Sequence, residues 1–190
     1  MVNPERVFKI AQQTVIVDGI DADEYILDIG GGGEGVIGQL MGTKVIAIDV
    51  IPNELAHSPE GPLKIIMDGR DLKFLDATFN TVTAFFSFMF IHPDDHAQVF
   101  QEIYRVLKRM GNFLLWEVEV QQPPEPQKDI FAFSLDVKLP TTVISTGYGT
   151  PYTERPIALI DYVTLAIDSG FELIKQNRDR QTFFCMFQKP

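Results

Sequence analysis

The stretch YILDIGGGGEG, at residues 25–35, places an apolar run directly before a cluster of glycines. Four of the glycines, from Gly30 to Gly33, are consecutive. Each costs up to about 1 kcal/mol of backbone entropy relative to alanine, so such a cluster suits a place where the backbone turns tightly or must approach another group closely. The stretch therefore predicts a buried strand that ends in a tight turn of bare backbone.

Five apolar runs of strand length follow one another along the chain, at residues 25–29, 44–48, 63–67, 81–91 and 113–118. Several are apolar at successive positions rather than at alternate ones, which is typical of strands covered by helices on both faces. Short connecting segments at 33–42, 52–60 and 70–80 fit crossovers between such strands. This alternation predicts an α/β fold with a doubly wound, mostly parallel sheet, in which a ligand binds at the carboxyl ends of the strands.

Two helices are predicted before and within this series of strands. A short one is expected at the N-terminus, where Asn3 can cap it and Pro4 takes its first position. A longer one is expected from Pro93 to Arg109, because its apolar residues recur at helical spacing and Gly111 stops it. The longer helix presents an apolar face that would pack on the sheet.

The end of the chain predicts one more helix and a hairpin. The helix is expected to begin near Thr153 and to end near Gly170. Its apolar face is expected to consist of Ile157, Ile160, Val163 and Ile167. Two strand-like runs, FELIKQ and QTFFCMF, then flank a polar turn, which is typical of an antiparallel hairpin.

Residues 121–152 mix prolines, aromatic residues and hydroxyl residues without a clear period, and we interpret them as an insertion or lid. Hydroxyl groups for an organic ligand are offered here by Thr146, Tyr148, Thr150, Tyr152 and the adjacent Thr153. The strand character of residues 136–145 would equally suit a homodimer contact. The whole chain, 1–190, is predicted to be a single domain with this insertion before the final helix and hairpin.

Composition narrows the class of ligand. The formal net charge is −10 and the isoelectric point is about 4.7, which argues against binding to nucleic acid or to an anionic membrane, because both reward clusters of lysine and arginine. The single cysteine, Cys185, excludes an intrachain disulfide, and no apolar run approaches the ~18 residues of a membrane span. We expect a cytoplasmic protein with a small-molecule ligand and without a metal site.

The glycines are followed by an acidic residue at the spacing of a nucleoside site. Gly30, Gly32 and Gly35 form a GxGxxG pattern, and Asp49 closes the next strand 21 residues after Asp28. A carboxylate at that place can accept hydrogen bonds from both ribose hydroxyls. Beside a pyrophosphate, Asp28 would add like-charge repulsion, whereas an ammonium group would compensate its charge. A nucleoside cofactor with a free amino acid end therefore fits better than a nicotinamide dinucleotide.

Over nearly its whole length the chain resembles the class I S-adenosylmethionine-dependent methyltransferases, and most closely the small-molecule branch that includes quinone-biosynthesis methyltransferases. The resemblance is carried by LDIGGGGEG at 27–35, VIAIDV at 45–50, MDGRDLKF at 67–74, FNTVTAFFSFMFIH at 79–92 and VLKRMGNFLLWE at 106–117. It implies a Rossmann-like sheet of seven strands with helices on both faces and a C-terminal antiparallel hairpin. It also implies S-adenosylmethionine as the methyl donor, S-adenosylhomocysteine as the product and a small-molecule acceptor.

The resemblance further implies where the cofactor binds. Asp28 would lie near the methionine amino group, Asp49 would hold the ribose, and Asp68 would accept from the adenine amino group. The full set of cofactor-binding residues that it implies is Asp28, Gly30, Gly31, Gly32, Gly33, Gly35, Asp49, Val50, Asp68, Gly69 and Phe86. At the position of the family's usual third glycine this chain has Glu34, so either the loop is one residue longer or Gly33 takes over the close approach.

His92 is the candidate catalytic base, because it ends the fourth predicted strand and imidazole titrates near neutrality. A histidine before Pro93 would equally cap the following helix. Glu117 ends the fifth strand and is predicted to point at the cleft, whereas His57 and His96 are predicted to be solvated.

Three other functions would share these residues. They are a nicotinamide-dependent oxidoreductase, a protein that binds S-adenosylmethionine without transferring its methyl group, and an aminopropyl transferase. The last one fits less well, because its decarboxylated cofactor would leave the glycine loop without an anion to bind.

Overall fold

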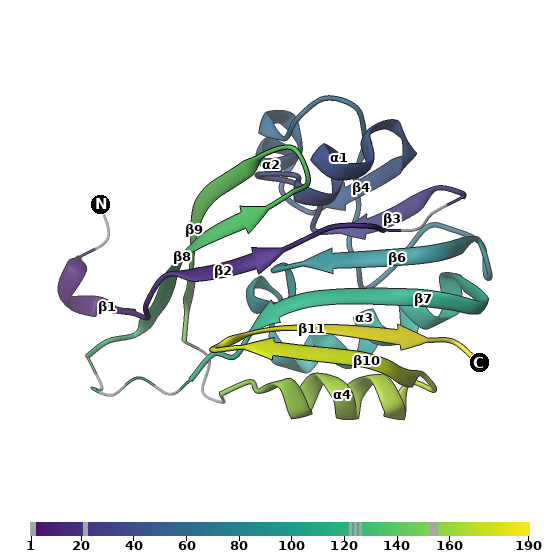
Figure 1. Ribbon diagram of the computed structural model, residues 1–190. Helices are drawn as coiled ribbons and strands as arrows, with labels where there is room; N and C mark the ends of the chain where they lie inside the picture. Colours follow the sequence, from purple (N-terminus) through teal and green to yellow (C-terminus); the bar gives the residue numbers. More distant parts are fainter. Residues whose placement is uncertain (1–2, 21–22, 122, 124, 126, 153–155) are drawn as a thin grey trace.

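The computed structural model describes residues 3–20, 23–121, 123, 125, 127–152 and 156–190, and most of its strands form one large sheet (Figure 1). This sheet has seven strands in the order β10-β11-β7-β6-β3-β4-β5. The strands are β3 (Ile26–Ile29), β4 (Val45–Asp49), β5 (Leu63–Ile66), β6 (Phe79–Phe85), β7 (Leu107–Val118), β10 (Glu172–Asp179) and β11 (Thr182–Gln188). β3 to β7 pair in parallel, and β11 is antiparallel to both of its neighbours. The predicted sheet and C-terminal hairpin are confirmed.

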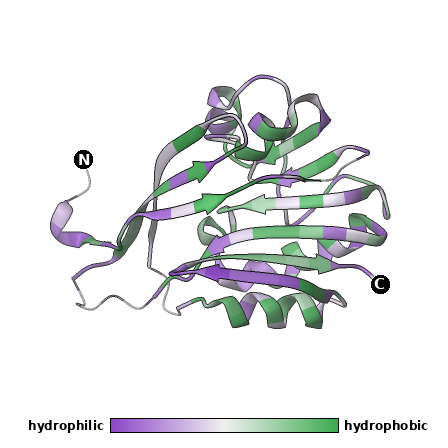
Figure 2. Cartoon of the chain, viewed as in Figure 1, coloured by the Kyte–Doolittle hydropathy of each residue, from purple (hydrophilic) through white to green (hydrophobic). Residues whose placement is uncertain are grey.

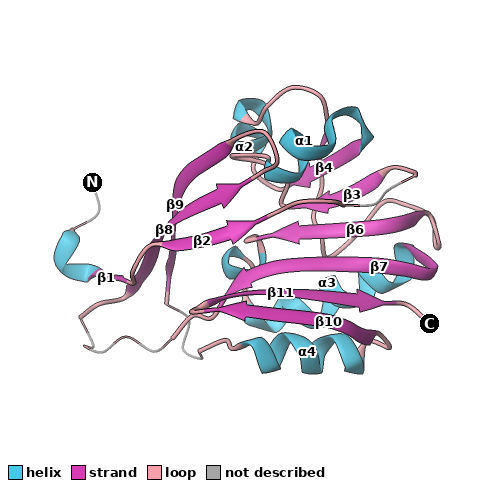
Figure 3. Cartoon of the chain, in the orientation of Figure 1, coloured by secondary structure: helices cyan, strands magenta, loops and turns pink. Residues whose placement is uncertain are grey.

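Helices cover both faces of the large sheet, as predicted (Figure 3). α1 (Val36–Met41) and α2 (Pro52–His57) contribute buried side chains to the core on one face. α3 (His96–Val106) and α4 (Leu159–Asp168) contribute to the core on the other face. The chain is therefore wound around the sheet in both directions from β3.

A second sheet of four strands joins the N-terminal segment to the predicted insertion. It consists of β1 (Val7–Lys9), β2 (Gln13–Ile16), β8 (Ile130–Lys138) and β9 (Val143–Pro151). β8 pairs in parallel with β1 and β2 and antiparallel with β9. The predicted N-terminal helix is confirmed only in its first turn: Asn3 caps a 3-10 helix, Pro4–Arg6, but β1 begins at Val7, where the helix was expected to continue. Backbone pairing with β8, more than a hundred residues away, outweighs the local helix signals there.

β8 alternates between buried and half-buried positions and packs its apolar side against the large sheet. The buried side consists of Phe131, Phe133, Leu135 and Val137, each at most 1% exposed. These side chains join the core to which α1 and α2 also contribute. The hairpin of β8 and β9, which we call the covering hairpin, therefore covers the same face of the large sheet. The strand character of residues 136–145 is used in this pairing within the chain.

The predicted end of the longer helix is wrong. α3 ends at Val106 instead of continuing to Arg109, because Leu107 already pairs with Phe79 on β6. After Leu107 the pairing of β7 with β6 is irregular: Met110 has φ +63°, and the register between the two strands shifts before Asn112. In addition, residues 70–80 contain no helix, so β5 and β6 are joined by turns and bends. The sequence pattern did not reveal that α3 ends where the long strand β7 begins.

The buried face of the last helix also differs from the predicted one. α4 buries Tyr162, Val163 and Ala166, whereas Ile160 and Ile167 are 66% and 56% exposed. Ile157 lies before α4 and forms a β-bridge with Val120. Thr153, which was predicted to start this helix, lies outside the described residues.

The edge of the large sheet that is formed by β10 is polar. β10 is exposed at nearly every position, and Figure 2 shows it in hydrophilic colours along most of its length. Charged edge strands are disfavoured partners for the pairing of sheets between molecules. No helix in the described part of the chain has both the length and the apolar composition that are needed to cross a membrane.

Candidate active site

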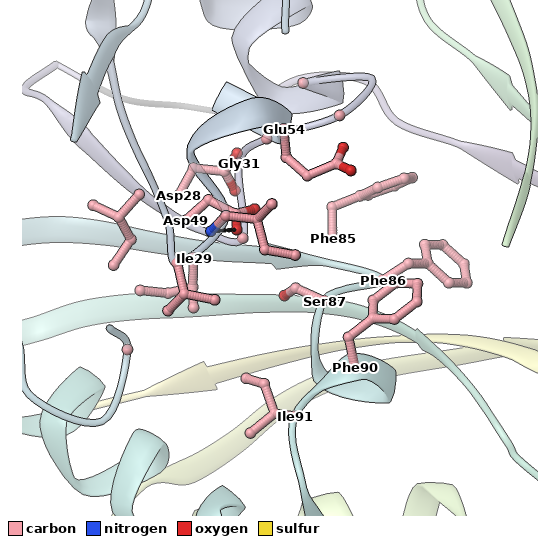
Figure 4. Close-up of a pocket in the computed structure, with 18 of the residues that line it drawn as sticks. Asp28, Ile29, Gly31, Asp49, Glu54, Phe85, Phe86, Ser87, Phe90 and Ile91 are labelled. Carbon is pink, nitrogen blue, oxygen red and sulfur yellow. Dashed lines mark hydrogen bonds between the residues drawn. The ribbon is translucent and has the colours of Figure 1, made fainter. Parts of the chain in front are cut away.

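A cavity of about 620 Å³ opens at the carboxyl ends of the parallel strands (Figure 4). Its lining comes from residues 28–36, 48–51, 54, 67–70, 85–87, 90–92, 95 and 147–149. Here the chain, after building β3 to β5 on one side of β3, crosses to β6 on the other side. Such a switch point is where open α/β sheets bind ligands. The cavity therefore lies where the sequence predicted a ligand site.

The glycine loop is bare because neighbouring groups leave no room for side chains. Gly30 has φ +71°, and a Cβ atom there would lie 2.4 Å from Cβ of Ser87 at the end of β6. A Cβ atom on Gly32 would lie 2.7 Å from Oδ2 of Asp49. Real Cβ atoms do not approach other atoms this closely, so the neighbouring groups would have to shift. The loop thus brings β3 close to the acidic end of β4 and to the hydroxyl at the end of β6.

Several amides of this loop donate to the protein itself. The N–H of Gly31 donates to the carbonyl of Ile48, and that of Gly33 donates to the carbonyl of Glu54, both at 3.0 Å. The N–H of Gly35 donates to Gly32. The three amides fix the course of the loop and are therefore not free to donate to a ligand.

Asp28 is a buried carboxyl at the base of the cavity, only 2% exposed. The hydroxyl of Thr83 donates to its Oδ1 at 2.7 Å. Burial raises the pKa of Asp28 to about 7, against the opposing effect of the Thr83 hydrogen bond, and the nearby charge of Asp49 raises this pKa slightly further. A bound ammonium group would favour the ionised form. The environment therefore fits the predicted role beside a cofactor amino group.

We expect the variant Asp28→Asn to be more stable than the parent protein above pH 7. The unfolded chain loses the Asp28 proton near about pH 4, whereas the folded protein holds it to about 7, so folding takes up a proton between these values. The stability contributed by protonated Asp28 is fully present below this window and is lost as the pH rises through it. Urea unfolding should show the variant gaining roughly 4 kcal/mol over the parent between the acid and the alkaline end. If the difference in stability between variant and parent stayed constant with pH, the pKa of Asp28 would not be raised in the folded protein.

The end of β4 presents a carboxylate beside two exposed apolar side chains. Oδ1 of Asp49 accepts the N–H of Ile51 at 2.9 Å, which fixes the orientation of the carboxylate. Val50 and Ile51 are 56% and 51% exposed and line the cavity. Exposed apolar side chains next to an oriented carboxylate suit an adenine ring attached to a ribose.

Asp68 also lines the cavity, but Arg70 already binds its carboxylate. Nη2 of Arg70 lies 2.7 Å from Oδ2 of Asp68, and Nη1 lies 2.8 Å from Oδ2 of Asp95. The hydrogen bonds from Arg70 lower the pKa of Asp68. Gly69 lines the cavity between the two charged residues. The predicted bond from the adenine amino group to Asp68 would have to share this carboxylate with Arg70.

The segment after β6 turns its side chains in alternate directions. Phe86 has φ +49°, is 1% exposed and donates its N–H to the carbonyl of Trp116 at 2.9 Å. Phe88 is fully buried in the core on the other face. Between them, Ser87 is 9% exposed, and its hydroxyl has no hydrogen-bond partner among the described residues. Figure 4 shows Ser87 between the acidic residues and the ring of Phe90.

The covering hairpin reaches the glycine loop through Glu34. The hydroxyl of Thr146 donates to Oε1 of Glu34, and the phenol of Tyr148 donates to Oε2 at 3.0 Å. Burial, followed by the charge of Glu34, raises the pKa of Tyr148, so the phenol stays protonated and acts as a donor. Sequence reasoning noted Glu34 only as a departure from a glycine pattern. Its partners lie 112 and 114 residues further along the chain, so no local signal could reveal this contact.

Only part of the predicted hydroxyl set reaches the cavity. Tyr148 lines it, with Gly147 and Gly149 on either side. Thr150 donates to the carbonyl of Met89 instead, and the buried phenol of Tyr152 has no partner among the described residues. Both lie outside the lining of the cavity.

The structure gives the three histidines different environments. His92 lines the cavity with a side chain that is 66% exposed, and its Nδ1 accepts the N–H of Asp94 at 3.3 Å. The capping arrangement that its position before Pro93 allowed is thus present. The prediction for His96 is wrong, because it is 1% exposed and Nε2 lies 3.1 Å from the carbonyls of Phe88 and Ile91. His57 is exposed at the end of α2.

Glu117 does not point at the cavity, which corrects a second prediction. Its side chain is fully buried at the end of β7 and accepts the N–H groups of Met89 and Val118 at 3.1 and 2.9 Å. Burial raises the pKa of Glu117 to about 8, although these hydrogen bonds oppose the shift. The carboxyl therefore holds the segment after β6 in place. Within the described residues, no group of three or more His, Cys, Asp or Glu side chains is arranged to hold a metal ion.

The strand order, the glycine loop and the acidic ends of β3 and β4 are typical of Rossmann-like sheets that bind nucleoside cofactors. Residues 27–115 match a family model described as a methyltransferase domain. No curated protein sequence matches the chain.

Solved structures share this fold. A methyltransferase from Methanosarcina mazei described as dependent on S-adenosylmethionine is 20% identical, with a TM-score of 0.59 over 90% of this chain and 94% of that one. The PH0226 protein of Pyrococcus horikoshii is 16% identical, with a TM-score of 0.62 over 88% and 83%. The cyclase SpnF is 15% identical, with a TM-score of 0.60 over 90% and 77%. Residues 27–115 are thus similar to a methyltransferase domain, and the chain shares the fold of these solved structures.

Proposed function

We propose that the protein transfers the methyl group of S-adenosylmethionine to a small organic acceptor inside the cavity. The observation that carries this proposal is the covering hairpin, which places Gly147, Tyr148 and Gly149 over a cavity of about 620 Å³. This volume lies within the range of roughly 300–1,000 Å³ that is typical of small-molecule sites. The net charge of −10 further disfavours a nucleic acid as the acceptor. We also retain the prediction of a cytoplasmic location, and a homodimer stays a prediction.

We assign the binding of the cofactor to residues from three strand ends. Asp28 would face the amino group, Asp49 the ribose, and Val50 the adenine, with the glycines at 30–33 and 35 forming the floor. Gly69 and Phe86 would complete the walls, and Asp68 would meet the adenine amino group. When bound, S-adenosylmethionine would supply a methyl group that is activated by the positively charged sulfur, which serves as its leaving group. The protein contributes position and the exclusion of water.

Calorimetric titration tests this proposal. S-adenosylhomocysteine should bind to the purified chain and NAD should not, and methyl-labelled S-adenosylmethionine should then label a component of a small-metabolite extract. Tight binding of NAD alone would favour the oxidoreductase and refute the proposal. Binding of the cofactor without any transfer would favour a non-catalytic binding protein or a different reaction, since a structure of similar fold is described as that of a cyclase.

His92 stays the proposed base, and its capping contact gives a condition for that role. While Nδ1 accepts the N–H of Asp94, the neutral ring carries its proton on Nε2, so His92 must leave the cap to accept a proton through Nδ1. If it is the base, the variant His92→Gln should lower kcat by about a hundredfold. The variant Asp94→Ala, which keeps the imidazole, is the matched control. An unchanged kcat in His92→Gln would leave His92 with the capping role alone.

A further inference from the structure

The lining of the cavity is strongly acidic. Six carboxyl groups contribute to it, from Asp28, Glu34, Asp49, Glu54, Asp68 and Asp95. Among the described lining residues, Arg70 is the only lysine or arginine, and its guanidinium is bound to Asp68 and Asp95. A cavity with walls of one charge concentrates ligands of the opposite charge and repels ligands of the same charge. An anionic acceptor is thus disfavoured.

The Ser87 hydroxyl supplies a second observation, which is independent of the charges. Its Oγ atom is buried, has no hydrogen-bond partner among the described residues, and belongs to the lining of the cavity. An unpaired buried hydroxyl is costly, because it has lost water without gaining a partner. A ligand with a polar group in the middle of the cavity would satisfy it.

An aromatic wall stands beside this hydroxyl. The ring of Phe90 lines the cavity and is 54% exposed. It meets the ring of Tyr148 edge-on at 6.2 Å, and Tyr148 stacks on Phe86 at 5.7 Å. An exposed phenylalanine in a cavity offers its face to a planar ring or to a cation. The side of the cavity opposite Asp28 and Asp49 thus favours a ring-bearing ligand (Figure 4).

Glu34 adds a fixed negative charge next to this wall. Its carboxylate accepts from Thr146 and Tyr148 of the covering hairpin, so its orientation is set before any ligand binds. A carboxylate has about four lone-pair sites, and these two donors leave room for another. Glu34 is therefore placed to bind an ammonium group of a ligand that stacks on the rings.

We propose that the methyl acceptor is a ring-bearing amine, with its ring against Phe90 and Tyr148 and its ammonium group toward Glu34. A polar atom of the ring system would pair with the Ser87 hydroxyl. This inference rests on the proposed function, because it concerns the acceptor part of the same cavity. Acceptors that carry a carboxylate or a phosphate in place of the amine are disfavoured by the acidic lining.

Matched pairs of probes test the proposal without requiring turnover. Tyramine and para-hydroxyphenylacetate share one ring and differ in the charge of the side chain, as do tryptamine and indoleacetate. Each is titrated calorimetrically into the protein at neutral pH, with and without saturating S-adenosylhomocysteine. The amine of each pair should bind at least about tenfold more tightly than the acid, in line with the strength of a desolvated charge pair. Equal binding of amine and acid, or no binding of either amine, would overturn the proposal.

The variant Glu34→Gln identifies the residue responsible. Glutamine keeps an oxygen that can accept from Thr146 or Tyr148 but removes the charge, so the preference for the amine should fall about tenfold. Glu172→Gln, on the exposed edge strand β10, is the matched control and should keep the parent's preference. If Glu34→Gln kept the full preference for the amine over the acid, Glu34 would not be the residue that binds the ammonium group. Failure of S-adenosylhomocysteine to bind would refute the proposed function. It would leave the preference for an amine testable, because the titrations without S-adenosylhomocysteine still compare amine with acid.

Discussion

Replacing Asp49 by alanine is expected to weaken the binding of S-adenosylhomocysteine about a thousandfold. The carboxylate is held by the N–H of Ile51 at 2.9 Å and stands beside Gly32, where no side chain fits. Its proposed partners are the two ribose hydroxyls. Two hydrogen bonds to a charged group contribute roughly 4 kcal/mol together, and each factor of ten in affinity corresponds to about 1.4 kcal/mol. Isothermal titration calorimetry measures this loss directly.

Two further variants show whether the loss arises from the ribose contact. Asp49→Asn keeps one acceptor oxygen for the N–H of Ile51, and its NH2 group can donate to a ribose hydroxyl, so it should lose only about tenfold in affinity. Asp71→Ala removes an exposed carboxylate that pairs with Lys73 outside the cavity, and it should bind like the parent. If Asp49→Ala bound S-adenosylhomocysteine as tightly as Asp71→Ala does, the carboxylate would have no role in holding the cofactor.

Replacing Gly30 by alanine is expected to cost roughly 2–5 kcal/mol of the free energy of unfolding. A left-handed φ of +71° costs a residue with a Cβ atom about 1–2 kcal/mol. The new methyl group would also lie 2.4 Å from Cβ of Ser87, and overpacking of this kind costs about 1–3 kcal/mol. Urea unfolding gives the difference, and the displaced Ser87 should weaken ligand binding as well.

Gly19→Ala separates the two causes. Gly19 has a similar φ of +59°, but a Cβ atom there would meet nothing within 4 Å. This control should lose only the backbone part, about 1–2 kcal/mol. Equal losses of stability in the two variants would mean that the contact with Ser87 is relieved at little cost. Glycine would then be needed at position 30 only for its backbone conformation.

Much of the large sheet was predictable because its signals are local. The apolar runs before Gly30 and around Asp49 are continuous, since these strands are covered on both faces, and such runs are visible in any short window. The C-terminal hairpin was equally visible from two strand-like runs around a polar turn. The acidic residues at the ends of β3 and β4 follow from the strands, because parallel strands bring their carboxyl ends to one edge.

The errors fall where distant pairing overrides local preference. The segment around Val7 carries helix signals but forms β1, because β8 offers it a partner. Leu107 leaves its helix for the same reason and pairs with Phe79. His96 looked solvated on a helix surface, yet the segment after β6 supplies two carbonyls that bury and bind it. In each case the deciding group is remote in the sequence, so no window of neighbouring residues contains it.

By itself, then, the sequence determined the sheet, the glycine loop and the class of cofactor, since periodicity, glycine content and the position of a carboxylate at a strand end are properties of short segments. Only the tertiary structure decided that the covering hairpin lies over the cavity, that Glu34 meets Thr146 and Tyr148, and that the Ser87 hydroxyl is left without a partner. These features depend on contacts between segments that are far apart in the chain. Such contacts form when buried apolar surface brings the two sheets together, and the spacing of residues along the sequence does not record them.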